Sequence, residues 1–196
     1  MGREKAGLGA ALIAAWFWFS VPIHAQMGAN PSELKLGRIS YQLTQLPDYY
    51  RTFLSGTALP ASALSARWLQ VEVQFESRLD WIDELQIKYY VLFGRGPDAR
   101  LFKGEMTHVN VQRGYNHYSA MFMQPNTVEE YGHGQVEAVA AQLFYKGRLV
   151  DQDSMPATRP PWWDKNTAVQ GFLLSPQQTP WSLIGYSRYE AVKATP

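Results

Sequence analysis

The sequence predicts an all-β protein built as an antiparallel β-sandwich. Several long segments alternate apolar and polar side chains with a period of two, which is the pattern of half-buried strands. Short turns rich in glycine, proline, asparagine and aspartate separate these segments, and no long segment has the spacing of an amphipathic helix. The chain has no cysteine, so its core has to stabilise the fold without disulfides.

The first three strands follow from the alternation of side chains. We expect them over residues 36–46, 67–76 and 85–93, with a link at residues 77–83 between the second and the third. In the second strand the apolar positions are separated by polar ones, which places them on one face. These apolar residues are Leu69, Val71, Val73 and Phe75.

The middle of the chain predicts a hairpin and a short helical turn. Residues 94–98 have strong turn chemistry and lead into a strand over residues 101–112. A turn at residues 113–116 is then expected to reverse the chain into a strand over residues 117–123. Residues 125–132 begin with proline and predict a single capped helical turn.

Two further strands and an irregular segment complete the expected domain. The strands cover residues 136–145 and 148–153 and are joined by a turn at Lys146 and Gly147. The aromatic-rich C-terminal segment, residues 156–196, is predicted to be irregular. Its residues 179–193 fit a helix as well as a strand, because a Thr-Pro pair favours a helix start whereas the glycine and aromatic residues that follow oppose a helix.

The N-terminus has the three parts of a secretory signal peptide, over residues 1–25. A short basic start precedes an apolar run at residues 6–19, and the small residue Ala25 precedes the expected cleavage site before Gln26. The run is shorter than the ~20 residues of a membrane-spanning helix. We therefore expect a secreted protein with no transmembrane anchor after processing; an uncleaved anchor is the alternative.

After cleavage, residues 26–35 are expected to be a mobile polar leader and residues 36–196 a single domain. Residues 1–25 contain two of the 18 basic and one of the 17 acidic residues, which leaves 16 of each. A net charge near zero provides no electrostatic attraction for nucleic acid. Nucleic acid is therefore not predicted as a partner.

The sequence lacks the motifs of common enzyme classes. We find no nucleophile elbow, zinc-protease motif, phosphate-binding loop or dinucleotide-binding turn. The sequence therefore predicts no enzyme, no catalytic residue and no cofactor. A hydrolase whose site is made of residues distant in sequence is the least favoured alternative.

A metal site is also not predicted. His108 and His117 would approach each other across the expected hairpin, but a zinc site needs at least a third ligand, and His133 lies in a Gly-His-Gly loop. Candidate calcium ligands are Asp151, Asp153 and Asp164. Scattered histidines and acidic strand ends are usually solvated or locally paired, so these residues are expected to be structural.

The stretch RPPWWD at residues 159–164 raises the question of partner binding. Its prolines lack N–H groups, so it is expected to be extended, with Trp162 and Trp163 pointing to opposite sides. The favoured interpretation is that both plug the open end of the sandwich. In the alternative, an exposed indole binds a protein or a glycan, with Trp162, Trp163 and Trp181 as candidates. A carbohydrate-binding module would need exposed, coplanar rings among Trp68, Trp81, Trp162, Trp163 and Trp181.

A set of segments spread over residues 67–193 carries a family resemblance: VEVQF, ELQIKYYVLF, NHYSAMFMQPNTVEEYG, AVAAQLFYKGRLV, PWWD and TPWSLIGYSRYEAVK. Together they resemble secreted immunoglobulin-like proteins of Verrucomicrobia that are linked to type IV pilus gene clusters. The resemblance implies an immunoglobulin-like β-sandwich that binds protein partners in a pilus or surface complex. It also implies the periplasm, outer membrane or pilus-associated cell surface of a Gram-negative bacterium as location. The cysteine pair of antibody domains is absent.

Overall fold

The computed structural model describes residues 33–55, 65–158, 161–164, 167–183 and 188–194. The predicted signal peptide and the cleavage site between Ala25 and Gln26 lie outside these residues, as does most of the predicted leader at 26–35. The first strand begins at Leu34, so the last two leader positions belong to the sheet.

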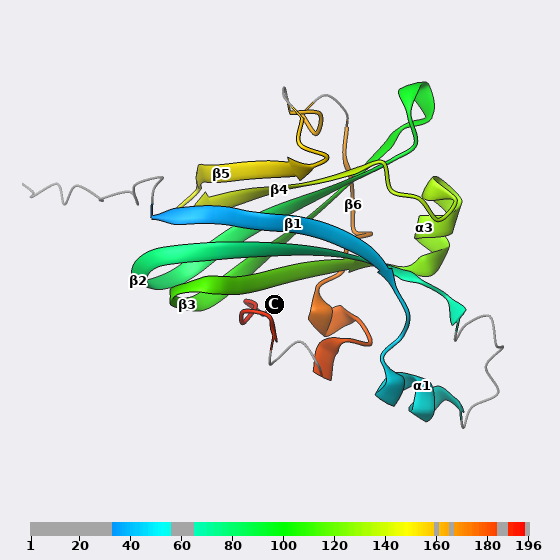
Figure 1. Ribbon diagram of the computed structural model, residues 1–196, viewed down its shortest axis with the longest axis horizontal. Coiled ribbons are helices and arrows are strands. Elements are labelled where there is room, and N and C mark those ends of the chain that lie inside the picture. Colours follow the sequence, from blue (N-terminus) through cyan, green and yellow to red (C-terminus); the bar gives the residue numbers. More distant parts are fainter. Residues whose placement is uncertain (1–32, 56–64, 159–160, 165–166, 184–187, 195–196) are drawn as a thin grey trace, which may run out of the picture.

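Two long strands dominate the protein (Figure 1). β2 (Trp68–Phe93) and β3 (Arg100–Met123) pair antiparallel over most of their length. The other strands are β1 (Leu34–Thr44), β4 (Ala138–Tyr145), β5 (Arg148–Met155) and β6 (Val169–Gln170). Two short α-helices, α1 (Asp48–Ser55) and α3 (Pro125–Gly132), and two 3₁₀ turns, η1 (Gly96–Asp98) and η2 (Pro176–Gln178), complete the described elements.

The prediction of separate strands in the middle of the chain is wrong. Residues 77–83 do not link two strands and residues 113–116 do not form a hairpin turn, because β2 and β3 run through both regions. Instead, the register of the pair shifts on either side of Ser77. β2 has more residues than β3 in this interval, and such bulges bend a strand without ending it. A bend of this kind has the same polar composition as a turn. The sequence pattern therefore predicted a link and a turn where the strands continue.

The bend folds the sheet back on itself. β1 pairs with residues 68–77 of β2 and β4 pairs with residues 85–92, both on the edge of β2 that faces away from β3. β1 also contacts β5, where the Leu36 N–H donates a hydrogen bond to the Asp151 carboxylate (2.9 Å). The predicted all-β, mainly antiparallel class is confirmed. The described strands form one curled, six-stranded sheet, however, and not the two separate sheets expected for an immunoglobulin-like sandwich.

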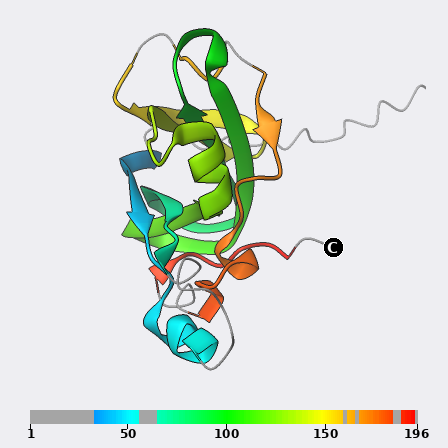
Figure 2. The same ribbon diagram turned by 90° about the vertical axis from the view of Figure 1, so that its right-hand side faces the viewer.

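Helix α3 covers one end of the curled sheet (Figure 2). The helical turn predicted at residues 125–132 is confirmed, with a proline in its first turn and His133 in the left-handed conformation at its end (φ 47°, ψ 42°). Gly132 allows the helix to approach the sheet closely, since a Cβ at this position would lie 2.4 Å from Cδ1 of Phe93. The last turn of α3 is therefore fixed against the core.

The main core lies inside the curl and is formed by alternate residues of the strands. Its buried members include Leu36, Leu69, Val71, Val73, Phe75, Leu85, Ile87, Tyr89, Val91, Phe93, Phe102, Met106, Met121, Met123, Val139 and Leu143. Two smaller clusters lie on the outer faces of the sheet. Trp181 packs there with Ala120 and Phe122, and Trp163 packs with Tyr90 and Ala140. The mostly irregular C-terminal segment thus covers parts of both outer faces.

Candidate functional site

The edge of β3 that faces away from β2 contacts several short extended segments. Residues 102–103 pair in parallel with β6, residues 107–109 pair with residues 191–193, and Phe122 exchanges two hydrogen bonds with Leu174 (2.8 and 2.7 Å). Because β3 is bent, its two arms also approach each other at this edge. The C-terminal segment therefore crosses the seam between the two layers of the folded sheet.

A groove of about 1000 Å³ lies at this seam, between the segments that pair with β3. Buried apolar side chains form part of its wall: Met106 and Met121 come from the two arms of β3, and Leu173 comes from the segment after β6. Amide and hydroxyl groups surround this apolar part, namely those of Gln170, Ser175, Gln177, Gln178, Ser182 and Tyr189. A volume of this size accommodates a small ligand or a short stretch of peptide.

Glu105 lies in the middle of the β3 stretch that lines the groove. The Thr107 C=O accepts a hydrogen bond from the Lys193 N–H (2.8 Å), so the main chain of Thr107 points to the outer edge. Main-chain groups in a strand alternate between its two edges. The N–H and C=O of Glu105 therefore point to the same outer edge. Within the described ranges, no backbone pairing on this edge is found for residues 104–106.

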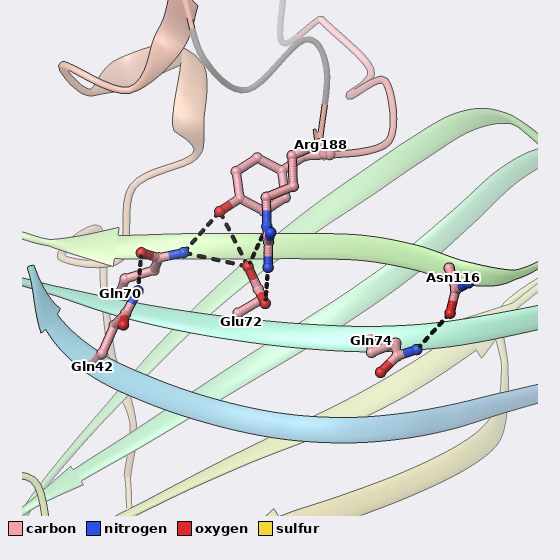
Figure 3. Close-up of polar contacts among 7 residues, drawn as sticks. Gln42, Gln70, Glu72, Gln74, Asn116 and Arg188 are labelled. Carbon is pink, nitrogen blue, oxygen red and sulfur yellow. Dashed lines mark hydrogen bonds and ion pairs between the residues drawn. The ribbon is translucent and has the colours of Figure 1, made fainter. Parts of the chain in front are cut away.

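The C-terminal segment is held to the sheet by Arg188 (Figure 3). Its guanidinium donates two hydrogen bonds to the Glu72 carboxylate on β2 (2.9 and 2.8 Å) and lies 4.8 Å from the ring centre of Tyr118. Hydrogen bonding to Glu72 raises the pKa of Arg188. A two-point contact of this kind fixes both distance and orientation. The segment is therefore oriented before it reaches the edge of β3.

Tyr189 continues the same polar cluster. Gln70 donates a hydrogen bond to its hydroxyl (2.8 Å), and Gln42 on β1 donates to Gln70 (3.0 Å). Burial raises the pKa of Tyr189 to about 12, and the neighbouring Glu72 carboxylate acts in the same direction. Tyr189 therefore stays neutral at physiological pH, and its hydroxyl donates a hydrogen bond to the Glu72 carboxylate (3.3 Å).

Glu190 connects the groove with the interior. Its carboxylate lies 2.7 Å from Nδ1 of His117, and the His117 ring stacks on Phe75 with 5.1 Å between ring centres. The other ring nitrogen, Nε2, is buried without a hydrogen-bond partner, and a Cβ on Gly114 would lie only 2.7 Å from it. His117 and Glu190 thus tie the C-terminal segment to the inner face of β3.

A chain of buried hydroxyl and imidazole groups lies beneath the seam. Tyr89 donates a hydrogen bond to the Ser119 hydroxyl, which lies 2.6 Å from Nε2 of His108. The His108 Nδ1 faces the main-chain oxygen of Glu190 (3.3 Å), which assigns the proton of a neutral ring to Nδ1. Burial lowers the pKa of His108 to about 4. A serine–histidine pair can activate a nucleophile, but both of these side chains are fully buried.

The predicted histidine pair lies in a different arrangement from the one expected. His108 and His117 belong to one continuous strand and not to two strands of a hairpin, and both lie beside Phe75. The oxygens of Asp151 and Asp153 accept hydrogen bonds from neighbouring main-chain N–H groups. In the part of the chain that the structure describes, no group of three or more histidine or acidic side chains is arranged to hold a metal ion.

The candidate tryptophans differ in exposure. Trp163 and Trp181 are 5% and 8% exposed, Trp162 is half-buried, and Trp81 is 49% exposed. The rings of Trp162 and Trp163 meet at 82° and those of Trp68 and Trp181 at 73°, so neither pair forms a flat platform for a sugar. Trp163 stacks on Tyr90 and Trp181 stacks on Phe122. Their indoles thus pack against the outer faces of the sheet. The plug interpretation expected Trp162 and Trp163 to be buried at an open end, whereas Trp163 is buried on an outer face and Trp162 is half-buried beside it.

Sequence reasoning did not identify Glu72, Arg188 and Glu190. Arg188 and Glu72 are 116 positions apart, and each is an ordinary charged residue in its local sequence. The repeated aromatic residues around Arg188 indicate only that this segment has apolar surface to bury. The contact between these residues is visible only in the folded chain.

Comparisons with known proteins identify a protein family and similar solved structures. A protein-family model matches residues 27–196. A crystal structure of a protein from Akkermansia muciniphila is similar, with a TM-score of 0.67 and 22% sequence identity over 84% of this chain and 94% of that chain. No curated protein matches the chain. The structural match supports the sheet-dominated fold. No helix among the described residues has the length and apolar character needed to span a membrane.

Proposed function

The chain belongs to the family whose model matches residues 27–196, and we propose that it is a non-enzymatic, protein-binding component of a bacterial surface assembly. The more specific form of the proposal is an assembly associated with a type IV pilus, in the periplasm, at the outer membrane or at the cell surface. The pilus association rests on the sequence resemblance of residues 67–193 described above. Export rests on the signal-peptide pattern of residues 1–25.

The groove at the edge of β3 is the observation that carries the binding role. It combines an apolar wall, a polar rim and a stretch of strand edge, which are the features used to dock a segment of another protein. The segment that borders it is held by the paired groups of Arg188, Glu190 and Lys193. A preorganised groove binds with a smaller loss of conformational entropy than a flexible one.

The arrangement of polar groups supports a binding role more than catalysis. The serine–histidine pair of Ser119 and His108 is fully buried beneath the seam, where a substrate has no access. At the groove itself, Glu190 is paired with His117. A hydrolase would need a nucleophile or a general base that reaches bound substrate.

Site-specific cross-linking in the native bacterium tests the proposal. A photo-reactive amino acid is placed at Gln177, on the rim of the groove, and at the exposed residue Arg148 of β5 as a control. We expect a discrete product between position 177 and a pilus or outer-surface protein, and no such product from position 148. Equal labelling from both positions, or products only with cytoplasmic proteins, would contradict the proposed function.

A second measurement tests export. Mass spectrometry of the chain recovered from the cell envelope should find Gln26 as its N-terminal residue. Recovery of the chain from the cytoplasm with residues 1–25 intact would contradict the proposed location.

A further inference from the structure

We infer that the groove binds one extended, uncharged segment of a partner protein, which adds a short strand to the edge of β3 at Glu105. This inference rests on the proposed function and specifies how the partner is bound. The N–H and C=O of Glu105 supply one donor and one acceptor at the groove. An extended peptide offers the complementary acceptor and donor at the spacing of a strand.

The pairings already present on this edge support an extended occupant. β6 pairs with residues 102–103 in parallel, and residues 191–193 pair with residues 107–109 in the antiparallel direction. Both are short segments that come from distant parts of the sequence. The Glu105 position lies between them, so a bound strand would continue a series of pairings that this edge already makes.

The charges around the groove favour an uncharged segment. Its charged residues are two lysines and two glutamates. Both lysines lie beside a carboxylate, since Lys103 is 3.7 Å from Glu105 and Lys193 contacts Glu84. The Glu190 carboxylate lies 2.7 Å from Nδ1 of His117. A charged side chain entering the groove would compete with these existing contacts and would lose hydration.

The apolar wall of the groove predicts that the bound segment carries apolar side chains. Met106, Met121 and Leu173 line the groove and are only 3–5% exposed, so they form its apolar wall. Methionine side chains adapt their shape to an apolar neighbour. Alternate side chains of an added strand point to the same face. A segment with an apolar residue at one or two alternate positions therefore fits both the edge and the wall.

Peptide selection tests the inference. Random 12-residue peptides displayed on phage are selected on the purified chain, and enriched peptides are resynthesised with a fluorescent label for binding measurements. Two variants act on the site: Glu105→Pro removes the outward N–H, and Ala191→Trp fills the groove with a bulky ring. Their controls are Glu105→Ala, which keeps the N–H, and Ala157→Trp, which makes the same change at an exposed residue away from the groove. Thermal unfolding checks that each variant is folded.

We expect enriched peptides to be uncharged, with apolar residues at alternate positions. Their affinity should fall about tenfold or more in Glu105→Pro and in Ala191→Trp, and should stay within about twofold of the parent in both controls. Methylation of the peptide main-chain nitrogen that faces Glu105 should cause a similar loss with the unmodified protein. This last measurement does not depend on the folding of any variant.

The remaining outcomes overturn the inference in distinguishable ways. Loss of binding in Ala191→Trp alone, with Glu105→Pro and the methylated peptide unaffected, would mean that the groove binds side chains without strand addition; the proposed function would stand. Failure to enrich any peptide would overturn the inference, while cross-linking from Gln177 would still decide the proposed function. Self-association of the chain that is abolished by Ala191→Trp would identify a second copy as the occupant.

Discussion

The guanidinium of Arg188 donates two hydrogen bonds to the carboxylate of Glu72, and this contact joins the C-terminal segment to the long strand β2. The Glu72 side chain is 17% exposed and that of Arg188 is 53% exposed, so the pair lies at the boundary between surface and interior. Residues 189–194, which border one side of the groove, follow directly after this contact. The pair therefore controls how firmly residues 189–193 lie along β3.

Replacing Arg188 should loosen the C-terminal segment. We expect Arg188→Ala to lower the free energy of unfolding by about 1 kcal/mol and to speed hydrogen exchange at the main-chain N–H of Lys193. Arg188→Lys should recover only part of the loss, because an ammonium cannot make the same two-point contact. Urea unfolding and hydrogen exchange measure these effects, with Arg148→Ala as the exposed control. Unchanged exchange at Lys193 in Arg188→Ala would show that other contacts hold the segment.

Acid should destabilise the protein through His108. Its pKa is lowered to about 4 in the folded chain, so between pH 6.5 and pH 4 the unfolded chain binds more protons than the folded chain. The stabilising contribution of neutral His108 is therefore complete above pH 6.5 and is lost as the pH falls towards 4. At pH 5 the loss should be about 2 kcal/mol.

Urea unfolding at pH 7.5 and pH 5 checks this effect. His108→Gln keeps a side chain that can hydrogen-bond to Ser119 but does not titrate, so its stability should change less between the two pH values. His133→Gln, at an exposed position, should retain the full pH dependence. If His108→Gln and the parent lose the same stability between these pH values, the acid sensitivity has another origin.

Gly132 should not tolerate alanine, although alanine normally favours a helix. A Cβ at Gly132 would lie 2.4 Å from the Phe93 ring. We expect Gly132→Ala to lower the free energy of unfolding by about 1–3 kcal/mol through overpacking, whereas the helix propensity alone would raise it by about 1 kcal/mol. The sign of the change in a denaturant titration separates the two effects. In the double variant Gly132→Ala with Phe93→Leu, the combined loss should be smaller than the sum of the single losses.

The two tryptophans Trp163 and Trp81 should differ sharply when truncated. Trp163 is 5% exposed and stacks on Tyr90, whereas Trp81 is 49% exposed. We expect Trp163→Ala to cost about 3–5 kcal/mol of stability and Trp81→Ala to cost less than about 1 kcal/mol. Thermal and urea unfolding of the two variants measure the difference. Similar losses from both would contradict the assignment of Trp163 to a core cluster.

The local pattern of side chains predicted much of the secondary structure correctly. Alternation identified the inward residues of β2, such as Val71 and Val73, and turn chemistry identified the helical turn at residues 125–132. Both signals are local, since neighbouring residues of a strand always point to opposite faces. The same signals failed at residues 77–83 and 113–116, because a bulged bend and a chain reversal have similar composition.

The candidate site could not be predicted in the same way. Three stretches line the groove, one on β3, one after β6 and one after Arg188, and none carries a motif of its own. The local sequence around Glu105 is that of an ordinary strand. Its place between two paired stretches of the strand edge is visible only in the folded chain. The pairing of residues 191–193 with β3 depends on contacts across more than 80 positions of the chain. No local pattern encodes such a pairing.

The sequence by itself determined that the chain is built from strands, which face of each strand is apolar, and that the core forms without disulfides. The tertiary structure decided that the strands form one sheet folded over itself, that the seam is crossed by the C-terminal segment, and that a groove is left beside Glu105. The physical reason is that the direction of a side chain depends on its neighbours in sequence. The bend of a strand and the pairing of its edge depend instead on which distant segments lie beside that strand. Contacts such as that between Arg188 and Glu72 hold these segments in place.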